Sequence, residues 1–376
     1  MLSTGIVTSD SLHWSMHRIL EIHPRGASPY PVLCGPELAE GLREVWQPAW
    51  RQAALIGDDN TLGMFGEHVA GPLRDLGVEV LKLSFAPGEA SKTRATKQAL
   101  EDAMLRAGLD RQAVVVGLGG GIVLDIAGFV AATFMRGIDH VFVATTLLAQ
   151  VDASVGGKTG VNTVQGKNLI GAFHHPRAVL LDTSALAQLP PDELRNGLAE
   201  AIKHALIEDA ALFASFEAWA ANGGAVSLRP PLDVIAACVG IKAQVVADDP
   251  REHGRRKILN FGHTVGHAIE HATAHAMPHG QAVAVGMVVE ARLALARGRL
   301  SEEALVRLVA LLTRLGLPIR PPCGFAAAAP YFGRDKKNHG GDIHCALPSR
   351  IGEVAPVGDA YTVPVAMDEI REAWGS

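Results

Sequence analysis

The sequence is poor in cysteine, and its few cysteines do not cluster. Four occur in 376 residues, at Cys34, Cys238, Cys323 and Cys345. None of them belongs to a CxxC pair, which argues against a thiolate zinc site. Their wide spacing is also not that of a small secreted domain held together by disulfides. We therefore expect reduced thiols in a cytoplasmic protein.

Long stretches of one charge and long apolar runs are also missing. Lys and Arg number 34 against 39 Asp and Glu, which gives a formal net charge of −5 without any basic tract. We therefore expect no nucleic-acid partner. Residues 1–14 lack the basic start and apolar core of a signal peptide, and no charge-free apolar run approaches the length of a membrane span. We expect no membrane partner either.

The first half of the chain alternates short apolar, β-branched runs with helical segments. The runs predict strands over residues 30–35, 53–59, 78–85, 113–120, 140–146 and 178–183. Such strands indicate a mostly parallel sheet covered on both faces. Later the pattern changes and predicts long helices over residues 192–207, 233–247, 262–274, 282–296 and 301–316. One further strand is expected near residues 342–348.

These patterns predict an α/β fold class in two domains. An N-terminal nucleotide-type domain with a parallel sheet would span residues 1–184, and a C-terminal all-helical domain would span residues 185–376. Ligands usually bind in clefts between such units. We therefore expect the functional site at the boundary between the two domains.

The segment AVVVGLGGGIVLDIAGFVAATF contains a strand, a glycine turn and a helix. Glycine lets the backbone approach a phosphate, and the helix N-terminus offers free N–H groups. The Rossmann fingerprint fits poorly, because Ile122 occupies the third glycine position and the next strand has no acidic residue at its end. The turn is therefore either a tight connection or a ligand site. Asp125, on the first helical turn, either complements the helix dipole or accepts a hydroxyl.

The helix ELRNGLAEAIKHALI carries Asn196, Glu200 and Lys203 opposite an apolar stripe. Spacing alone favours a solvated face with one weak Glu–Lys pair. The alternative is a carboxylate metal ligand beside an anion-binding lysine.

Five histidines follow one another at intervals of four residues, at His263, His267, His271, His275 and His279. A step of four residues rotates by about 40° on an α-helix, so the series drifts away from one face. We expect Pro278 to end the helix, which assigns His279 to the next element. Spacing alone leaves open a metal site and a ladder of surface imidazoles.

Four segments together resemble the 3-dehydroquinate synthases and, more broadly, the sugar phosphate cyclases: VDASVGGKTGVNTVQGKNLIGAF, LPPDELRNGLAEAIK, RRKILNFGHTVGHAIE and HGQAV. The resemblance extends from about Tyr30 to Gly352. It implies a Rossmann-like N-terminal domain, bound NAD, a divalent metal (Zn²⁺ or Co²⁺) and a homodimer. The implied partner is a small sugar phosphate, which the enzyme converts into a carbocycle.

The resemblance also assigns roles to individual residues. Metal ligands would be Glu200, His263 and His279, a donor set suited to zinc. Lys167 would bind the substrate, and catalytic contacts would come from Asp152, Lys158, Asn168, Lys203, Lys242, Arg256, Asn260, His267 and Lys336. A substrate that carries phosphate and carboxylate needs many cations. Without the family, each isolated lysine, Lys242 and Lys336 included, would be taken for a solvated surface charge.

The implied cofactor contacts fall in the first half of the chain. They are Asp58, Asn60, Glu89 and Lys92 on the adenosine side, and Gly120, Gly121, Asp125, Thr145, Thr146, Asp152 and Lys158 toward the pyrophosphate and nicotinamide. The family pattern gives His271 and His275 no role, so we interpret both as structural or exposed.

The chain departs from the family pattern at a few positions. Gln281 stands where the family usually has Glu, and we expect the lost charge to alter the tautomer or orientation of His279. Leu124 replaces a frequent Gly, and His174 and His175 follow the GAF string. Because of these departures, a cyclase of secondary metabolism that acts on sedoheptulose 7-phosphate is an alternative function.

The implied reaction converts 3-deoxy-D-arabino-heptulosonate 7-phosphate, or its amino analogue, into 3-dehydroquinate. Hydride passes to NAD⁺ and returns within one turnover, and phosphate leaves. The retained GGKTGVN and GKN strings and the Lys336–Lys337 pair favour such a carboxylate-bearing substrate. A metal-dependent polyol dehydrogenase is a further alternative, but a polyol carries no phosphate for the cations to bind. A non-catalytic protein on this scaffold would not need all three metal ligands.

Overall fold

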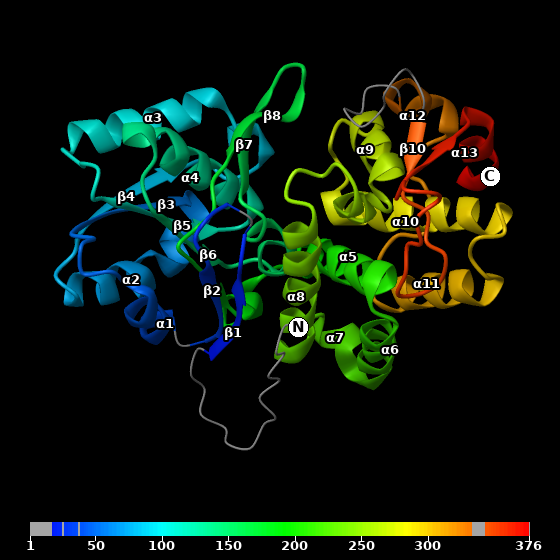
Figure 1. The fold of residues 1–376 in the computed structure, drawn as a ribbon, viewed down its shortest axis with the longest axis horizontal. Coiled ribbons are helices and arrows are strands. Elements are labelled where there is room, and N and C mark those ends of the chain that lie inside the picture. Colours follow the sequence, from blue (N-terminus) through cyan, green and yellow to red (C-terminus); the bar gives the residue numbers. More distant parts are fainter. Residues whose placement is uncertain (1–16, 25, 37, 333–342, 376) are drawn as a thin grey trace.

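The computed structural model describes residues 17–24, 26–36, 38–332 and 343–375. Figure 1 shows an α/β part and a helical part side by side. We call them the sheet lobe, with the described residues of 17–182, and the helical lobe, with those of 191–375. The last strand of the large sheet ends at Asp182 and the first long helix of the helical lobe begins at Pro191. A domain boundary after residue 184 stays a prediction.

The sheet lobe is built on seven strands in the order β1-β2-β9-β6-β5-β3-β4. β1 runs antiparallel to β2, and the other neighbours are parallel. The strands are β1 (His17–Ile22), β2 (Tyr30–Gly35), β3 (Gln52–Asp58), β4 (Glu79–Phe85), β5 (Val114–Gly119), β6 (His140–Ala144) and β9 (Ala178–Asp182). All six strands predicted for the first half are confirmed, and β1 was not predicted.

Successive side chains along a strand point to opposite faces of the sheet. Both faces of this sheet carry apolar side chains, and helices cover both of them. Leu55 and Val116 pack with α1 (Leu38–Val45) and α2 (Asp59–Asp75). Ile56 and Val115 pack with α3 (Arg94–Arg106) and α4 (Gly121–Thr133) on the other face. β5, β6 and β9 are buried along their whole length, as the apolar runs predict.

A β-hairpin extends from the sheet lobe beside the helical lobe (Figure 1). It consists of β7 (Lys158–Thr163) and β8 (Gly166–Phe173), paired antiparallel. The strands approach closely, since a Cβ on Gly171 would lie 1.9 Å from the Thr159 carbonyl oxygen. The GKN string and most of the GGKTGVN string lie on this hairpin. The sequence did not predict strands in this segment.

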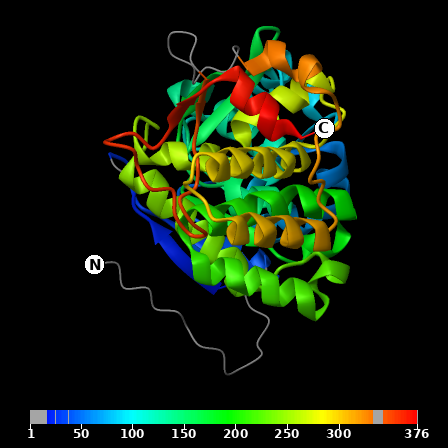
Figure 2. The same ribbon diagram turned by 90° about the vertical axis from the view of Figure 1, so that its right-hand side faces the viewer.

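The helical lobe is centred on α5 (Pro191–Glu208) and α10 (His279–Ala296) (Figure 2). Around them lie α6 (Ala210–Trp219), α7 (Ala225–Ser227), α8 (Leu232–Asp248), α9 (His263–Ala272), α11 (Glu302–Arg314), α12 (Phe325–Phe332) and α13 (Met367–Trp374). A two-stranded ladder joins β10 (Ile343–Cys345) to β11 (Val363–Val365). The predicted α/β and helical architecture is confirmed. The sequence indicated β10 but not β11.

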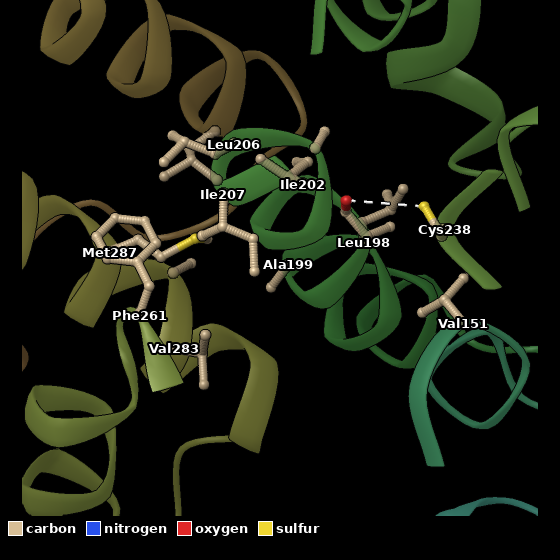
Figure 3. Close-up of a cluster of buried hydrophobic side chains, with 14 of the residues drawn as sticks. Val151, Leu198, Ala199, Ile202, Leu206, Ile207, Cys238, Phe261, Val283 and Met287 are labelled. Atoms are coloured by element: carbon tan, nitrogen blue, oxygen red, sulfur yellow. Dashed lines mark hydrogen bonds between the residues drawn. The ribbon is translucent and has the colours of Figure 1, made fainter. Parts of the chain in front are cut away.

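The core of the helical lobe surrounds α5 on several sides. Figure 3 shows Ile207 of α5 facing Phe261 and Met287, while Leu198 lies on the side of Val151 from the sheet lobe. α5 therefore connects the cores of the two lobes.

No single helix in the described part of the chain is long and apolar enough to cross a membrane. The segments Ala210–Ser227 and Leu232–Asp248 reach the required length and composition only as a pair, and that pair is bent by 115°.

Candidate active site

The three side chains predicted as metal ligands lie together where α5, α9 and α10 meet. The Nε2 atoms of His263 and His279 lie 3.4 Å and 3.6 Å from Oε1 of Glu200. One ligand atom from each residue lies within 4.8 Å of the others. Oε1 of Glu200 is buried and has no hydrogen-bond partner among the described residues. One carboxylate and two imidazoles arranged in this way suit Zn²⁺ or Co²⁺ with positions left for a substrate.

The burial of α5 explains how Glu200 reaches this position. The solvated-face interpretation of α5 is wrong, because Glu200 and Lys203 are 1% and 2% exposed. Every residue from Gly197 to Ile207 is buried, since α8 and α10 pack around the helix. A buried carboxylate needs a charged partner, and Lys203 donates to Oε2 of Glu200. This pairing leaves Oε1 directed at the two histidines.

The start of α9 is fixed by a carboxylate from α10. Glu290 accepts hydrogen bonds from the backbone N–H of Gly262 at 2.7 Å and of Val265 at 3.1 Å. The helices approach closely here, since a Cβ on Gly286 would lie 1.9 Å from the Gly262 carbonyl oxygen. Gly262 has a positive φ of 79° directly before the helix. These contacts place His263 at the first position of α9.

The start of α10 is fixed by α5 in a similar way. The side-chain oxygen of Asn196 accepts the N–H of Gly280. A Cβ on Gly280 would lie 2.0 Å from the Asn196 carbonyl oxygen. Asn196 lies one turn before Glu200, so the same helix that carries the carboxylate ligand also positions His279.

The histidine series leaves the helix before it reaches His279. α9 ends at Ala272, and Ala274 and His275 have positive φ values of 50° and 62°. The expectation that Pro278 ends this helix is therefore wrong, because the positive-φ residues end it first and Pro278 precedes α10. His271 and His275 pack against each other with ring centroids 5.1 Å apart, and neither belongs to the ligand group.

The electrostatics of the ligand group favour a cation. Burial alone would raise the pKa of the Glu200 carboxyl, but Lys203, His263 and His279 hold it well below its usual range. Burial and the nearby Lys203 lower the pKa of His263, so that its ring is neutral. Burial would also lower the pKa of His279, but the nearby carboxylates of Glu200 and Glu270 raise it to about 10. Positive charge is thus stabilised between two buried carboxylates.

A second group of charged side chains, which surrounds the partly exposed Asp152, lies beside the ligands. Nζ of Lys242 lies 2.7 Å from Oδ1 of Asp152, and Nε2 of His204 lies 3.5 Å from the same oxygen. Burial alone would raise the pKa of Asp152, but Lys242 and His204 hold it well below its usual range. Lys242 and Arg256 are 6% and 3% exposed, so interpreting Lys242 as a surface charge is wrong. Sequence reasoning missed His204, which adjoins Lys203 on α5.

Two lysines of the β7–β8 hairpin contact the helical lobe. Lys158 pairs with Glu252, and Nδ2 of Asn260 donates to the other oxygen of Glu252 at 2.8 Å. Nζ of Lys167 lies 2.9 Å from Oε1 of Glu270 on α9. The candidate substrate residues of both lobes therefore meet at the lobe boundary. Sequence reasoning missed both glutamates, although Glu270 is the last residue of the GHTVGHAIE string.

Of three further candidate residues, the structure describes His267 and Asn168 but not Lys336. The ring of His267 lies 5.4 Å from that of His263 and 6.0 Å from that of His279, measured between centroids. Asn168 follows Lys167 on β8 and has a positive φ of 53°. Lys336 lies outside the described residues.

Apart from Asp152 and Lys158, the residues implied for the cofactor follow the carboxyl ends of four neighbouring parallel strands. Asp58 ends β3 and Asn60 follows it, and the others follow β4 (Glu89, Lys92), β5 (Gly120, Gly121, Asp125) and β6 (Thr145, Thr146). Ligands of open α/β sheets usually bind at this edge.

The glycine turn brings two of these loops close together. A Cβ on Gly120 would lie 3.0 Å from Cγ2 of Thr146. Asp125 pairs with Lys92, which is almost fully buried. Asp125 therefore does more than complement the dipole of α4, because it holds the lysine that follows β4. The turn is a close connection at an edge suited to a ligand.

Comparison with known proteins agrees with this arrangement. Residues 82–196 match the family described as 3-dehydroquinate synthase N-terminal, and residues 197–338 match that described as 3-dehydroquinate synthase C-terminal. The 3-dehydroquinate synthase of Symbiobacterium thermophilum is 45% identical over 356 residues, which cover 93% of this chain and 98% of the relative. That of Halorhodospira halophila is 44% identical over 354 residues, with the same coverage.

Solved structures give the same result for the fold. A 2-deoxy-scyllo-inosose synthase complexed with carbaglucose-6-phosphate, NAD⁺ and Co²⁺ superposes with a TM-score of 0.86 at 27% identity, over 96% of this chain and 99% of the other. ValA, a 2-epi-5-epi-valiolone synthase from Streptomyces hygroscopicus with NAD⁺ and Zn²⁺ bound, gives 0.81 at 31% identity, over 92% and 95%. The chain belongs to the 3-dehydroquinate synthase family of phosphate-eliminating carbon–oxygen lyases.

Proposed function

We propose that this chain converts 3-deoxy-D-arabino-heptulosonate 7-phosphate into 3-dehydroquinate with release of phosphate. The observation that carries the proposal is the meeting of Glu200, His263 and His279 with cationic side chains from both lobes. The 45% identity to a 3-dehydroquinate synthase over 93% of the chain supports the same reaction.

Glu200, His263 and His279 would hold the divalent cation. Oε1 of Glu200 is buried and finds no hydrogen-bond partner in the described part of the chain, which supports this role because a carboxylate oxygen is costly to bury without a partner. When bound, Zn²⁺ or Co²⁺ supplies Lewis-acid polarisation of a substrate hydroxyl. The structural relatives described with Co²⁺ and Zn²⁺ support the choice of metal.

The cationic side chains would bind the anionic ends of the substrate. Lys158 and Lys167 now pair with Glu252 and Glu270, so a phosphate or carboxylate would compete with these glutamates for the lysines. Arg256 lies beside the GGK turn, since a Cβ on Gly156 would fall 2.8 Å from its Nη2. Lysine and arginine at this density suit a phosphorylated acid better than a neutral polyol.

NAD would bind along the carboxyl edge of β3, β4, β5 and β6. The N-terminus of α4, with Gly120 and Gly121, would receive the pyrophosphate, because helix N-termini stabilise anions. Asp152 and Lys158 would lie toward the nicotinamide. The homodimer implied by the family and the cytoplasmic location expected from the cysteine pattern belong to the same proposal.

A phosphate-release assay tests the proposal directly. With NAD⁺ and Zn²⁺, we expect kcat/KM to be far higher for 3-deoxy-D-arabino-heptulosonate 7-phosphate than for sedoheptulose 7-phosphate, and we expect no net NADH. Absence of phosphate release from the first substrate would contradict it.

The same assay examines two alternatives. A preference for sedoheptulose 7-phosphate would favour a valiolone-type cyclase, which the similarity to ValA supports. Accumulation of NADH with a simple polyol would indicate a dehydrogenase. The glycerol dehydrogenase of Schizosaccharomyces pombe, at 15% identity and a TM-score of 0.64, shares the fold alone.

A further inference from the structure

Glu270 is a buried carboxylate with a partner on each oxygen. It lies near the end of α9 and is 3% exposed. Oε2 lies 3.2 Å from Nδ1 of His279, and Oε1 lies 2.9 Å from Nζ of Lys167. Burying a charge in this way is costly unless both oxygens are satisfied. The conformation of Glu270 is therefore determined jointly by a candidate metal ligand and by the β7–β8 hairpin.

The contact with His279 determines which ring nitrogen faces the metal site. Nε2 of this ring lies 3.6 Å from Oε1 of Glu200, on the side of the ligand group. A neutral imidazole presents an Nε2 lone pair only when Nδ1 carries the proton, and an acceptor at Nδ1 fixes that tautomer. Glu270 is that acceptor, and it also restricts rotation of the ring.

The two candidate histidine ligands are supported unequally. Nδ1 of His263 lies 3.2 Å from the carbonyl oxygen of Phe261, a neutral acceptor two residues away in the same segment. The His263 side chain is 13% exposed, whereas that of His279 is 32% exposed. The less enclosed ring has fewer packing restraints, so it depends more on its hydrogen bond. It receives a charged acceptor from a different helix.

This arrangement answers the question raised by Gln281. Comparison with the family pattern predicts that the missing charge at position 281 alters the tautomer or orientation of His279. Glu270 supplies a carboxylate to Nδ1 of the same ring from α9.

We propose that Glu270 is a positioning residue for His279, and that through Lys167 it connects the substrate-binding hairpin to the cation site. This inference rests on the proposed cation binding by Glu200, His263 and His279. A positioning role can be distinguished from a purely structural ion pair between Glu270 and Lys167. Breaking a purely structural pair would leave the cation affinity unchanged. A positioning role also differs from ligation by Glu270 itself, since the ammonium of Lys167 already lies against one carboxylate oxygen.

The test is the cation affinity of the full-length chain carrying Glu270→Gln. Gln keeps the size of the side chain, but its single carbonyl oxygen cannot accept from both His279 and Lys167. Chelator competition should show Zn²⁺ and Co²⁺ bound about 10- to 100-fold more weakly than in the wild type, the usual effect of losing a group that orients a metal ligand. The visible absorption of the Co²⁺-loaded variant should change as the geometry around the ion changes.

Two variants serve as controls. His271→Asn alters the next residue of α9, whose ring stacks on Tyr331 at 5.4 Å, and should leave cation affinity and the Co²⁺ spectrum unchanged. Lys167→Met removes the other partner of Glu270 and should raise KM for the sugar phosphate much more than it weakens cation binding. Together they separate an effect on the ligand from a general effect on α9 or on the lobe boundary.

Each outcome bears on the proposal in a defined way. Wild-type affinity and an unchanged Co²⁺ spectrum in Glu270→Gln would overturn it. The proposal would also be overturned if the wild type bound two cations and this variant lost one of them, because Glu270 would then be a ligand itself. If the wild type itself binds no cation, the proposed ligand site fails instead. Thermal unfolding of the metal-free proteins verifies folding. Should Glu270→Gln not fold, Glu270→Asp, which keeps the charge on a shorter side chain, should show an intermediate loss of affinity, and full retention would overturn the proposal.

Discussion

The two lobes hold their candidate residues in different ways. In the sheet lobe, Gly120 and Thr145 directly follow a strand, so the sheet itself places them at one edge. In the helical lobe, Glu200, Lys203 and Glu270 lie inside packed helices, and each is paired with another charge. A change at Gly120 should therefore disturb the core less than a change at Glu200 or Glu270, which contribute to stability and binding together. The predictions below test this difference.

The largest effect is expected for Glu200→Ala. The change removes a carboxylate that is 1% exposed and leaves the Lys203 ammonium buried without its partner. We expect loss of bound Zn²⁺ and of phosphate release, together with a loss of about 3 to 5 kcal/mol in the free energy of unfolding. Metal analysis and urea denaturation of the metal-free protein measure the two effects. Normal metal content in this variant would rule out Glu200 as a ligand.

A matched pair of glycine substitutions compares the lobes directly. Gly286→Ala would place a Cβ 1.9 Å from the Gly262 carbonyl oxygen, a backbone atom that cannot rotate away. We expect a destabilisation of about 1 to 3 kcal/mol or more and weaker cation binding, because the start of α9 must shift. Gly120→Ala would meet side-chain atoms of Thr146, with Cγ2 at 3.0 Å and Oγ1 at 3.3 Å, and no backbone atom as close as in Gly286→Ala. It should weaken NAD binding with a smaller effect on stability, as measured by calorimetric titration and thermal unfolding. Equal destabilisation by the two changes would contradict the comparison.

The same difference explains which parts of the molecule could be predicted from sequence. Five of the six predicted strands, β2, β3, β5, β6 and β9, are apolar runs that are buried along most or all of their length. The sixth, β4, lies at the edge of the sheet and was predicted from its valine and leucine residues, although none of its residues is fully buried. β7 and β8 were missed because KTGVNT and GKNLIGAF are rich in glycine and polar residues, and the hairpin contributes little more than Val161 to the apolar core. β11 is a three-residue strand with a proline in the middle, a residue that argues against a strand.

The candidate site was less predictable for a related reason. Helical periodicity assigned Glu200 to a solvated face, and only the resemblance to a family identified it as a ligand. The partners of the site residues carry even less local signal. Glu270 and Lys167 are 103 residues apart in the sequence, so nothing near either one indicates the contact. Packing of whole helices and the hairpin brings them together, and a single sequence does not display that packing.

A buried histidine of the sheet lobe is expected to have a moderate, pH-dependent effect on the free energy of unfolding. His140 on β6 is fully buried, and neither ring nitrogen has a hydrogen-bond partner among the described residues. Burial, reinforced by His174 and His175, lowers its pKa well below 6.5. The unfolded chain therefore binds a proton first, so stability is fully present above about pH 6.5 and is lost as the pH falls toward the folded pKa.

His140→Leu should remove this loss. Urea denaturation between pH 5 and pH 8 (about the range in which an unperturbed histidine titrates) should show the wild type losing stability relative to the variant below about pH 6.5. Parallel curves for the two proteins would show that His140 finds a partner for its charged form. That result would make this sheet-lobe histidine resemble the charge-paired residues of the helical lobe.

The smallest effect is expected for Gln281→Ala. Gln281 lies two residues after His279 on α10, and the departure from the family pattern predicts that this position influences the ring. In the structure Nδ1 of His279 is held by Glu270 instead. Cation affinity measured by chelator competition should therefore stay at the wild-type value. A loss comparable to that of Glu270→Gln would mean that Gln281 shares the support of His279, and that orientation of this ligand depends on α10 as well as on α9.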